Sequence, residues 1–179
     1  MIHRKEFYYV RHGQTDYNLK ADKKEDHPPE ITLNETGKRQ AESIKPLIAS
    51  LPIKTVCCSP FKRAQQTKEI ITPKLLAPHC DIPNLGECTA LIWREMRLFG
   101  KRNFLESKEP IRSFFEKVQD GLNQALSQEG PVLIVAHGGV HWAICSLLNP
   151  IDHEWVIDNC TPVHFTVSPN GLWQARKLI

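Results

Sequence analysis

Long apolar runs are missing from this sequence, which excludes the membrane-spanning classes of protein. No apolar run approaches the roughly 20 residues that a helix needs to cross a bilayer. The stretch from Met1 to Glu6 is charged and lacks the apolar region of a signal peptide. Internal repeats and low-complexity segments are missing as well. We therefore expect a cytoplasmic protein with no membrane partner, folded as a single domain over residues 1–179.

Excess charge of either sign is also small, because the formal net charge is only +3. Nucleic-acid-binding domains usually show a basic face and a pI above roughly 9, so we expect no nucleic-acid partner. Positive charge is concentrated at one place in the middle of the chain. The residues of this basic cluster are Arg94, Arg97, Lys101 and Arg102. The cluster could bind an additional anionic group on a ligand, or it could be a solvated surface.

The 6 cysteines include no C-x-x-C pair, and the histidines include no His-Glu-x-x-His motif. Cys57 and Cys58 lie in a short β-branched run, where cysteine behaves as a small apolar residue. Free thiols are typical of a reducing compartment. His137 and His141 are four residues apart, but no carboxylate at helical spacing completes a metal site with them. We expect neither a metal nor another cofactor.

Apolar periodicity divides the chain into alternating strands and helices. Asn34 is a good N-cap for a helix whose apolar residues recur at steps of three and four, with Pro46 inside that pattern. Pro and Gly punctuate region 74–108, where we expect a short strand near Leu91. The other expected strands cover 7–10, 55–58 and 132–136, the other helices cover about 61–72, 111–127 and 138–148, and a hairpin pairs 163–167 with 172–177.

This order of elements predicts an α/β fold, namely a three-layer α/β/α sandwich with a mostly parallel central sheet and a C-terminal antiparallel hairpin. In such sheets, ligands bind beyond the carboxyl ends of the strands. Chemically capable residues follow three of the expected strands: Arg11-His12-Gly13, Ser59 to Arg63, and His137-Gly138-Gly139. Two histidines and two arginines should therefore meet at one rim of the sheet.

The residues at this rim suit a phosphate ester. A phosphomonoester carries about −1.5 to −2 charges near neutral pH, and the planar fork of arginine matches phosphate oxygens. Arg11 and Arg63 are the candidates for this role. Their charge disfavours protonation of an imidazole between them, which would keep His12 neutral as a nucleophile. We expect His137 to hydrogen-bond the oxygens of the transferring phosphoryl group.

Further donors and one acid complete the expected site. Gly13 would let the backbone approach the phosphate, and Gly138 opens a helix whose N-terminal amides attract anions. The leaving oxygen needs a proton, which a carboxyl group usually supplies in such chemistry. We expect Glu95 to be this acid, with Glu87 as the alternative. Additional hydrogen-bond donors to the substrate would come from Gln14, Thr15 and Asn18.

The full set of motifs resembles that of the histidine phosphatase superfamily, the group that includes cofactor-dependent phosphoglycerate mutases. The motifs are Arg11 to Thr15 with Asn18, Leu33 to Gly37, Ser59 to Thr67, Trp93 to Glu95, and His137 to Gly139. The resemblance implies that His12 becomes phosphorylated. It further implies that Arg11, Arg63 and His137 hold the phosphoryl group, and that Glu95 protonates the leaving group and later activates water.

Two departures distinguish the chain from the mutases of that group. The mutase run Gly-x-Trp-Glu-Gly is missing after Glu95, and the stretch from Glu95 to His137 is short. We therefore expect a phosphoric monoester hydrolase of the histidine acid phosphatase type, acting without a metal on a small phosphometabolite or a phosphoprotein. The alternatives are mutase-type phosphoryl transfer and a non-catalytic phosphate-binding module.

Overall fold

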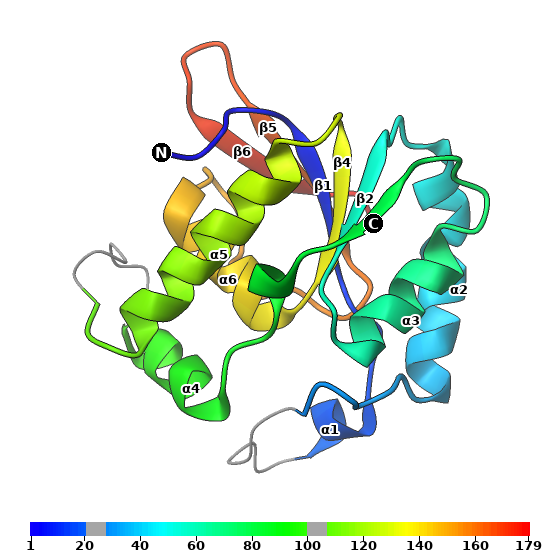
Figure 1. Ribbon diagram of the computed structural model, residues 1–179, viewed down its shortest axis with the longest axis horizontal. Helices are drawn as coiled ribbons and strands as arrows, with labels where there is room; N and C mark the ends of the chain where they lie inside the picture. The colour runs from blue at the N-terminus through cyan, green and yellow to red at the C-terminus, as the bar shows by residue number, and fades with distance from the viewer. Residues whose placement is uncertain (21–27, 100–106) are drawn as a thin grey trace.

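The computed structural model describes residues 1–20, 28–99 and 107–179, and within them the strands form a single mixed sheet (Figure 1). The sheet has the strand order β3-β2-β4-β1-β5-β6. Strands β3, β2, β4 and β1 run parallel, whereas β5 pairs antiparallel with β1 and β6 pairs antiparallel with β5. The strands are β1 (Phe7–Arg11), β2 (Thr55–Cys58), β3 (His79–Asp81), β4 (Val132–Ala136), β5 (Pro162–Val167) and β6 (Trp173–Lys177).

Helices cover both faces of the sheet and form the outer two layers (Figure 1). The first face carries α2 (Glu35–Ser50) and α3 (Lys62–Ile71), and the opposite face carries α4 (Ala90–Phe99), α5 (Ile111–Leu126) and α6 (Gly138–Leu148). A short helix α1 (Asp16–Leu19) and a 3₁₀ turn η1 (Pro83–Leu85) complete the described elements. The expected three-layer fold with a mostly parallel sheet is thus confirmed.

Strand β4 shows why two cores form. Successive strand residues point to opposite faces, so Leu133 and Val135 pack in the core under α2 and α3. Val132, Ile134 and Ala136 pack in the other core, with α5 and α6. All five residues are buried, as the continuous apolar run predicts for a central strand.

Most expected elements are confirmed; the exceptions are the short helix α1, which was not expected, and region 74–108. The strand expected near Leu91 is wrong, because that position belongs to helix α4. The buried residues Ile92 and Met96 lie four apart, which is the spacing of one helix face. The short strand β3 was not expected, and its side chains are largely exposed. Helix α2 begins as expected, with the side chain of Asn34 accepting a hydrogen bond from the backbone N–H of Gly37.

The register of the parallel strands sets the position of the site. Arg11 lies opposite Ala136 on the neighbouring strand, and Cys58 lies opposite Val135. The residues that follow these strands therefore emerge at the same edge of the sheet. None of the helices in the described ranges is both long enough and apolar enough to cross a membrane.

Candidate active site

His12 lies at the carboxyl end of β1 and is almost completely buried. Its backbone N–H donates to the carbonyl oxygen of Ala136 at 2.9 Å, which fixes the end of β1 against β4. Its ring Nδ1 lies 2.7 Å from the carbonyl oxygen of Gly13. A carbonyl oxygen only accepts, so the proton of the neutral ring sits on Nδ1. The lone pair therefore sits on Nε2.

Arg63, in the first turn of α3, faces that lone pair. Its side chain is fully buried, and its Nε donates to the Nε2 of His12 at 3.3 Å. One terminal nitrogen donates to the carbonyl oxygen of Pro28 at 3.1 Å, whereas the other has no partner within the described residues. Burial lowers the pKa of Arg63 to about 10, with Glu87 opposing the shift and Arg11 adding to it. The guanidinium stays charged near neutral pH.

Arg11, the last residue of β1, supplies a second, half-buried guanidinium. Its Nη1 donates to the carbonyl oxygen of Ile157 at 2.6 Å, and its Nε has no partner within the described residues. Burial lowers the pKa of Arg11, and the charge of Glu87 is the largest of the effects that oppose this shift. A Cβ at Gly138 would lie 3.4 Å from the Nε of Arg11, so Gly138 leaves the guanidinium room.

His137 reaches the same edge from β4. Its Nε2 lies 2.7 Å from the Oγ of Ser59, and its ring centroid lies 5.2 Å from that of His12. The backbone of His137 is also fixed, because the hydroxyl of Tyr9 donates to its carbonyl oxygen at 2.6 Å. The structure thus brings together Arg11, His12, Arg63 and His137, as the sequence predicted.

The loop after His12 is fixed by close backbone packing. The backbone N–H of Gly13 donates to the Oγ1 of Thr67 at 3.0 Å. A Cβ on Gly13 would lie 2.5 Å from the carbonyl oxygen of Gly37, and a Cβ on Gly37 would overlap the backbone of Gln14. The close approach that these glycines permit is therefore between the loop and the start of α2.

The other expected donors also support this loop. The side chain of Gln14 accepts from Asn34, and its backbone N–H donates to Gln40. Thr15 is fully buried and donates through its Oγ1 to the Oδ1 of Asn18 at 3.1 Å. Of these expected substrate contacts, Asn18 lines the pocket beside Arg11.

The two candidate acids occupy different environments. Glu87 lines the pocket that also contains Arg11, Asn18, Trp93 and Gly138. Its carboxylate accepts from the backbone N–H of Gly139, the second residue of α6, at 3.1 and 3.3 Å. Glu95, in contrast, does not line this pocket. Its side chain is 44% exposed and lies 3.7 Å from a terminal nitrogen of Arg94.

Comparison with known proteins identifies the family. The model of the histidine phosphatase superfamily (branch 1) matches residues 7–178. The chain belongs to this superfamily. An uncharacterized phosphatase, PhoE of Bacillus subtilis, is 31% identical over 153 residues, which cover 81% of this chain and 78% of that protein. Phosphatase activity, in the broad sense, is supported by this membership and by the phosphatase names among the relatives.

A second relative is longer and carries a different name. Agropine synthesis reductase of Rhizobium rhizogenes is 33% identical over 179 residues, covering 89% of this chain but only 39% of that protein. Among solved structures, a putative alpha-ribazole-5'-P phosphatase from Escherichia coli aligns with a TM-score of 0.70 at 20% identity, over 98% of this chain and 96% of that one. A mycobacterial hydrolase aligns with a TM-score of 0.72 at 18% identity, over 96% of each chain. These structural likenesses establish the shared fold.

Several residues support the site without having been predicted from the sequence. Asn159, in the loop before β5, donates through its side-chain amide to the carbonyl oxygen of His12 at 2.8 Å. The backbone N–H of Cys160 donates to the carbonyl oxygen of Arg11 at 2.9 Å. With the carbonyl oxygen of Ile157, these contacts make segment 157–160 a support for the end of β1. An isolated Asn in an irregular segment gives no sequence signal of such a role.

The basic cluster of this histidine phosphatase is only partly described by the structure. Arg94 and Arg97 lie on α4 and are exposed. Lys101 and Arg102 lie outside the described residues. A contact between this cluster and a substrate therefore stays a prediction.

Proposed function

We propose that this histidine phosphatase hydrolyses phosphomonoesters through a phosphohistidine formed at the Nε2 of His12, without a metal. One observation supports this proposal above all others. The buried guanidinium of Arg63 donates to the imidazole of His12, the half-buried Arg11 directly precedes that histidine, and each guanidinium has a buried nitrogen with no acceptor within the described residues. Buried donors are nearly always satisfied, so these two await an anionic ligand.

The proposed first step transfers the phosphoryl group to the protein. The lone pair on Nε2 of His12 forms a bond to phosphorus as the bond from phosphorus to the ester oxygen breaks. Arg11, Arg63 and His137 stabilise the charge on the phosphoryl oxygens. The leaving oxygen takes a proton from the carboxyl group of Glu87 and departs as an alcohol.

The proposed second step returns the enzyme to its starting state. Glu87, now a carboxylate, removes a proton from water, whose oxygen attacks the phosphorus. The bond from phosphorus to Nε2 breaks, and its electron pair returns to His12. Inorganic phosphate is released, and Glu87 is again protonated for the next cycle.

Glu87 takes the place of Glu95 in this proposal because of its surroundings. Glu87 lines the pocket beside Arg11, whereas Glu95 does not. The contact with the backbone N–H of Gly139 holds the carboxylate in place at the amino end of α6. Glu95 is directed toward Arg94 and solvent instead.

The proposed substrates are small phosphometabolites or phosphorylated protein side chains. Cys88, Thr89 and Trp93 line the pocket together with Glu87, so an apolar and an aromatic surface lie next to the phosphate site. A leaving group with an apolar or ring portion suits this wall. If Arg97, Lys101 and Arg102 bind a second anionic group, their replacement should raise KM for the natural substrate but not for an aryl phosphate.

The test is hydrolysis of an aryl phosphate with EDTA present, combined with acid-labile phosphoenzyme trapping. Wild-type protein should release phosphate and carry label on His12, whereas His12→Asn should do neither. His3→Asn is the matched control, because His3 is exposed and uses only its backbone N–H in a hydrogen bond. Hydrolysis by His12→Asn at the wild-type rate would refute the proposal. Label transfer to a second substrate without phosphate release would identify a mutase instead.

A further inference from the structure

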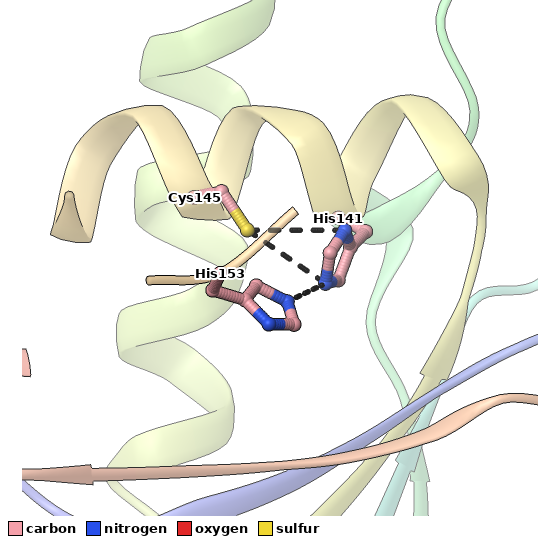
Figure 2. A group of neighbouring side chains, drawn as sticks. All are labelled: His141, Cys145 and His153. Atoms are coloured by element: carbon pink, nitrogen blue, oxygen red, sulfur yellow. Dashed lines mark hydrogen bonds between the residues drawn. The ribbon is translucent and has the colours of Figure 1, made fainter. Parts of the chain in front are cut away.

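A second group of chemically capable side chains lies outside the phosphate pocket. His141 and Cys145 are one helical turn apart on α6, and His153 reaches them from the segment after that helix (Figure 2). All three side chains are buried. Figure 2 shows that they point toward one another. Their potential ligand atoms lie within 4.8 Å of one another.

The distances in this cluster match those around a tetrahedral metal ion. Zinc bonds of about 2.0–2.1 Å to nitrogen and 2.3 Å to sulfur place two nitrogens about 3.3 Å apart and a sulfur about 3.6 Å from a nitrogen. The Nε2 atoms of His141 and His153 lie 3.2 Å apart. The Sγ of Cys145 lies 3.7 Å from the Nε2 of His141. Two of the three distances between ligand atoms therefore already match those around a bound ion.

The ring of His141 is oriented as a metal ligand requires. Its Nδ1 lies 3.0 Å from the carbonyl oxygen of Trp155, which only accepts, so the proton of the neutral ring sits on Nδ1. The Nε2 then presents its lone pair to the cluster. Metal-bound histidines almost always donate their other N–H to a carbonyl or carboxylate in this way.

From these contacts we infer that His141, Cys145 and His153 form a binding site for one thiophilic metal ion, Zn²⁺ or Cu⁺. A thiolate and two imidazoles are the ligand set that such ions prefer, whereas Mg²⁺ and Ca²⁺ require oxygen ligands. The cluster itself offers no carboxylate. Aromatic rings of Tyr9 and Phe165 lie against the histidines, so the site is also shielded from water.

Binding would exchange a hydrogen bond for metal bonds with a simple proton balance. In the metal-free chain, the Nε2–H of His153 donates to the Nε2 of His141. On binding, the His153 proton moves to its Nδ1, and Cys145 loses its thiol proton to solvent. One proton is released per metal ion, and nothing is oxidised or reduced.

The bound ion would fasten α6 to the segment that supports the phosphate site. The residue that accepts from His141 is Trp155, and two residues further the carbonyl oxygen of Ile157 accepts from Arg11. The other end of α6 begins directly after His137. The ion would thus have a structural role, in which it joins α6 to the segment after it, since none of its ligands lines the pocket itself.

The experiment is a metal titration of chelator-stripped protein, compared between wild type and Cys145→Ser. Zn²⁺ and, in an anaerobic arm, Cu⁺ should bind wild type at one equivalent per chain, at least 100-fold more tightly than the variant. Co²⁺ in place of Zn²⁺ should give a thiolate-to-cobalt charge-transfer band that the variant lacks. Cys80→Ser is the matched control, because Cys80 is only half-buried and lies outside the cluster; it should bind like wild type.

Three results would overturn the inference. These are binding of equal strength in wild type and Cys145→Ser, no binding of either ion, and binding of Mg²⁺ as tight as that of Zn²⁺. Hydrolysis of an aryl phosphate with EDTA reports whether each variant is folded. Because that activity uses no metal, loss of the metal site and failure of the proposed phosphatase mechanism are separate outcomes.

Discussion

The Nε of Arg63 donates to the Nε2 of His12 at 3.3 Å, so a positive charge lies directly against the atom that would attack phosphorus in the proposed mechanism. In this contact the lone pair on Nε2 accepts the N–H of Arg63. When a phosphate binds, its oxygens would accept hydrogen bonds from the guanidinium N–H groups, which would free the lone pair on Nε2 to attack phosphorus. The arrangement depends on the planar shape of the side chain, because a lysine presents a point charge instead of a fork.

The first prediction is that Arg63→Lys lowers kcat/KM for an aryl phosphate by about 100-fold, because loss of one preorganised donor costs about that much or more. The decisive measurement is steady-state kinetics. Arg39→Lys on α2 serves as control, since Arg39 is exposed and contacts only Thr36 through its side chain. Similar rates in both variants would mean that the fork of Arg63 plays no part in transfer.

The second prediction separates the two candidate acids. Glu87→Gln should slow hydrolysis of an alkyl phosphate by about 10²–10⁴-fold, the usual contribution of general acid catalysis. A dinitrophenyl phosphate, whose leaving group needs no proton, should be affected much less in the first step. Glu95→Gln should leave both rates unchanged, since its carboxylate faces Arg94. The reverse pattern would return the role of acid to Glu95.

The third prediction concerns the close packing of the His12 loop against α2. Gly37→Ala should lower the free energy of unfolding by about 1–3 kcal/mol, because the added Cβ overlaps the backbone of Gln14 and the site is overpacked. Denaturant unfolding provides the measurement. Gly130→Ala is the control, since its nearest contact would be an ordinary 3.7 Å. Equal stability of the two variants would show that the loop after His12 can shift away from α2 at little cost in free energy.

The fourth prediction is acid sensitivity of the metal-free protein. Burial lowers the pKa of His141 from 6.5 to about 3, so between these values the unfolded chain binds a proton that the folded chain does not. The free energy of unfolding should therefore fall as the pH drops through that window, by at most about 1.4 kcal/mol per pH unit from this residue.

Urea unfolding at several pH values in EDTA tests this expectation. His141→Gln should have a lower stability at pH 7 but a shallower slope between pH 6 and pH 4. His164→Gln should keep the wild-type slope, because His164 is partly exposed on β5 beside Glu6. An unchanged slope in His141→Gln would assign the acid sensitivity to other groups.

The parallel half of the fold and the phosphate-binding residues could be predicted because both follow from local sequence. Continuous apolar runs predict the central strands, and Arg11, His12 and His137 come directly after them. The carboxyl ends of neighbouring parallel strands meet at one edge, so adjacency in space follows from position in the chain. Arg63 follows from the same reasoning, because it lies in the first turn of α3, shortly after β2.

The sequence offers Glu95 and Glu87 as candidate acids, but their surroundings and the backbone supports could not be predicted because they depend on tertiary packing. Glu87 lies in an irregular stretch with no periodic pattern, and its contact with Gly139 joins residues that are 52 positions apart in the sequence. Helix α4 was misread as a strand because Leu91 and Ile92 suggest a short apolar run, whereas the burial of Ile92 and Met96 is set by packing against the α5 side of the sheet. Asn159 is separated from His12 by 147 residues and carries no local signal.

Strand β1 has a parallel neighbour on one side and an antiparallel neighbour on the other. The loop that precedes β5 therefore lies where the loops after β1 and β4 begin, and its residues Ile157 and Asn159 contact Arg11 and His12. That loop takes no part in the pairing of the parallel strands β1, β2 and β4. For directed evolution, it is a place where the surroundings of His12 can be varied from outside the parallel sheet.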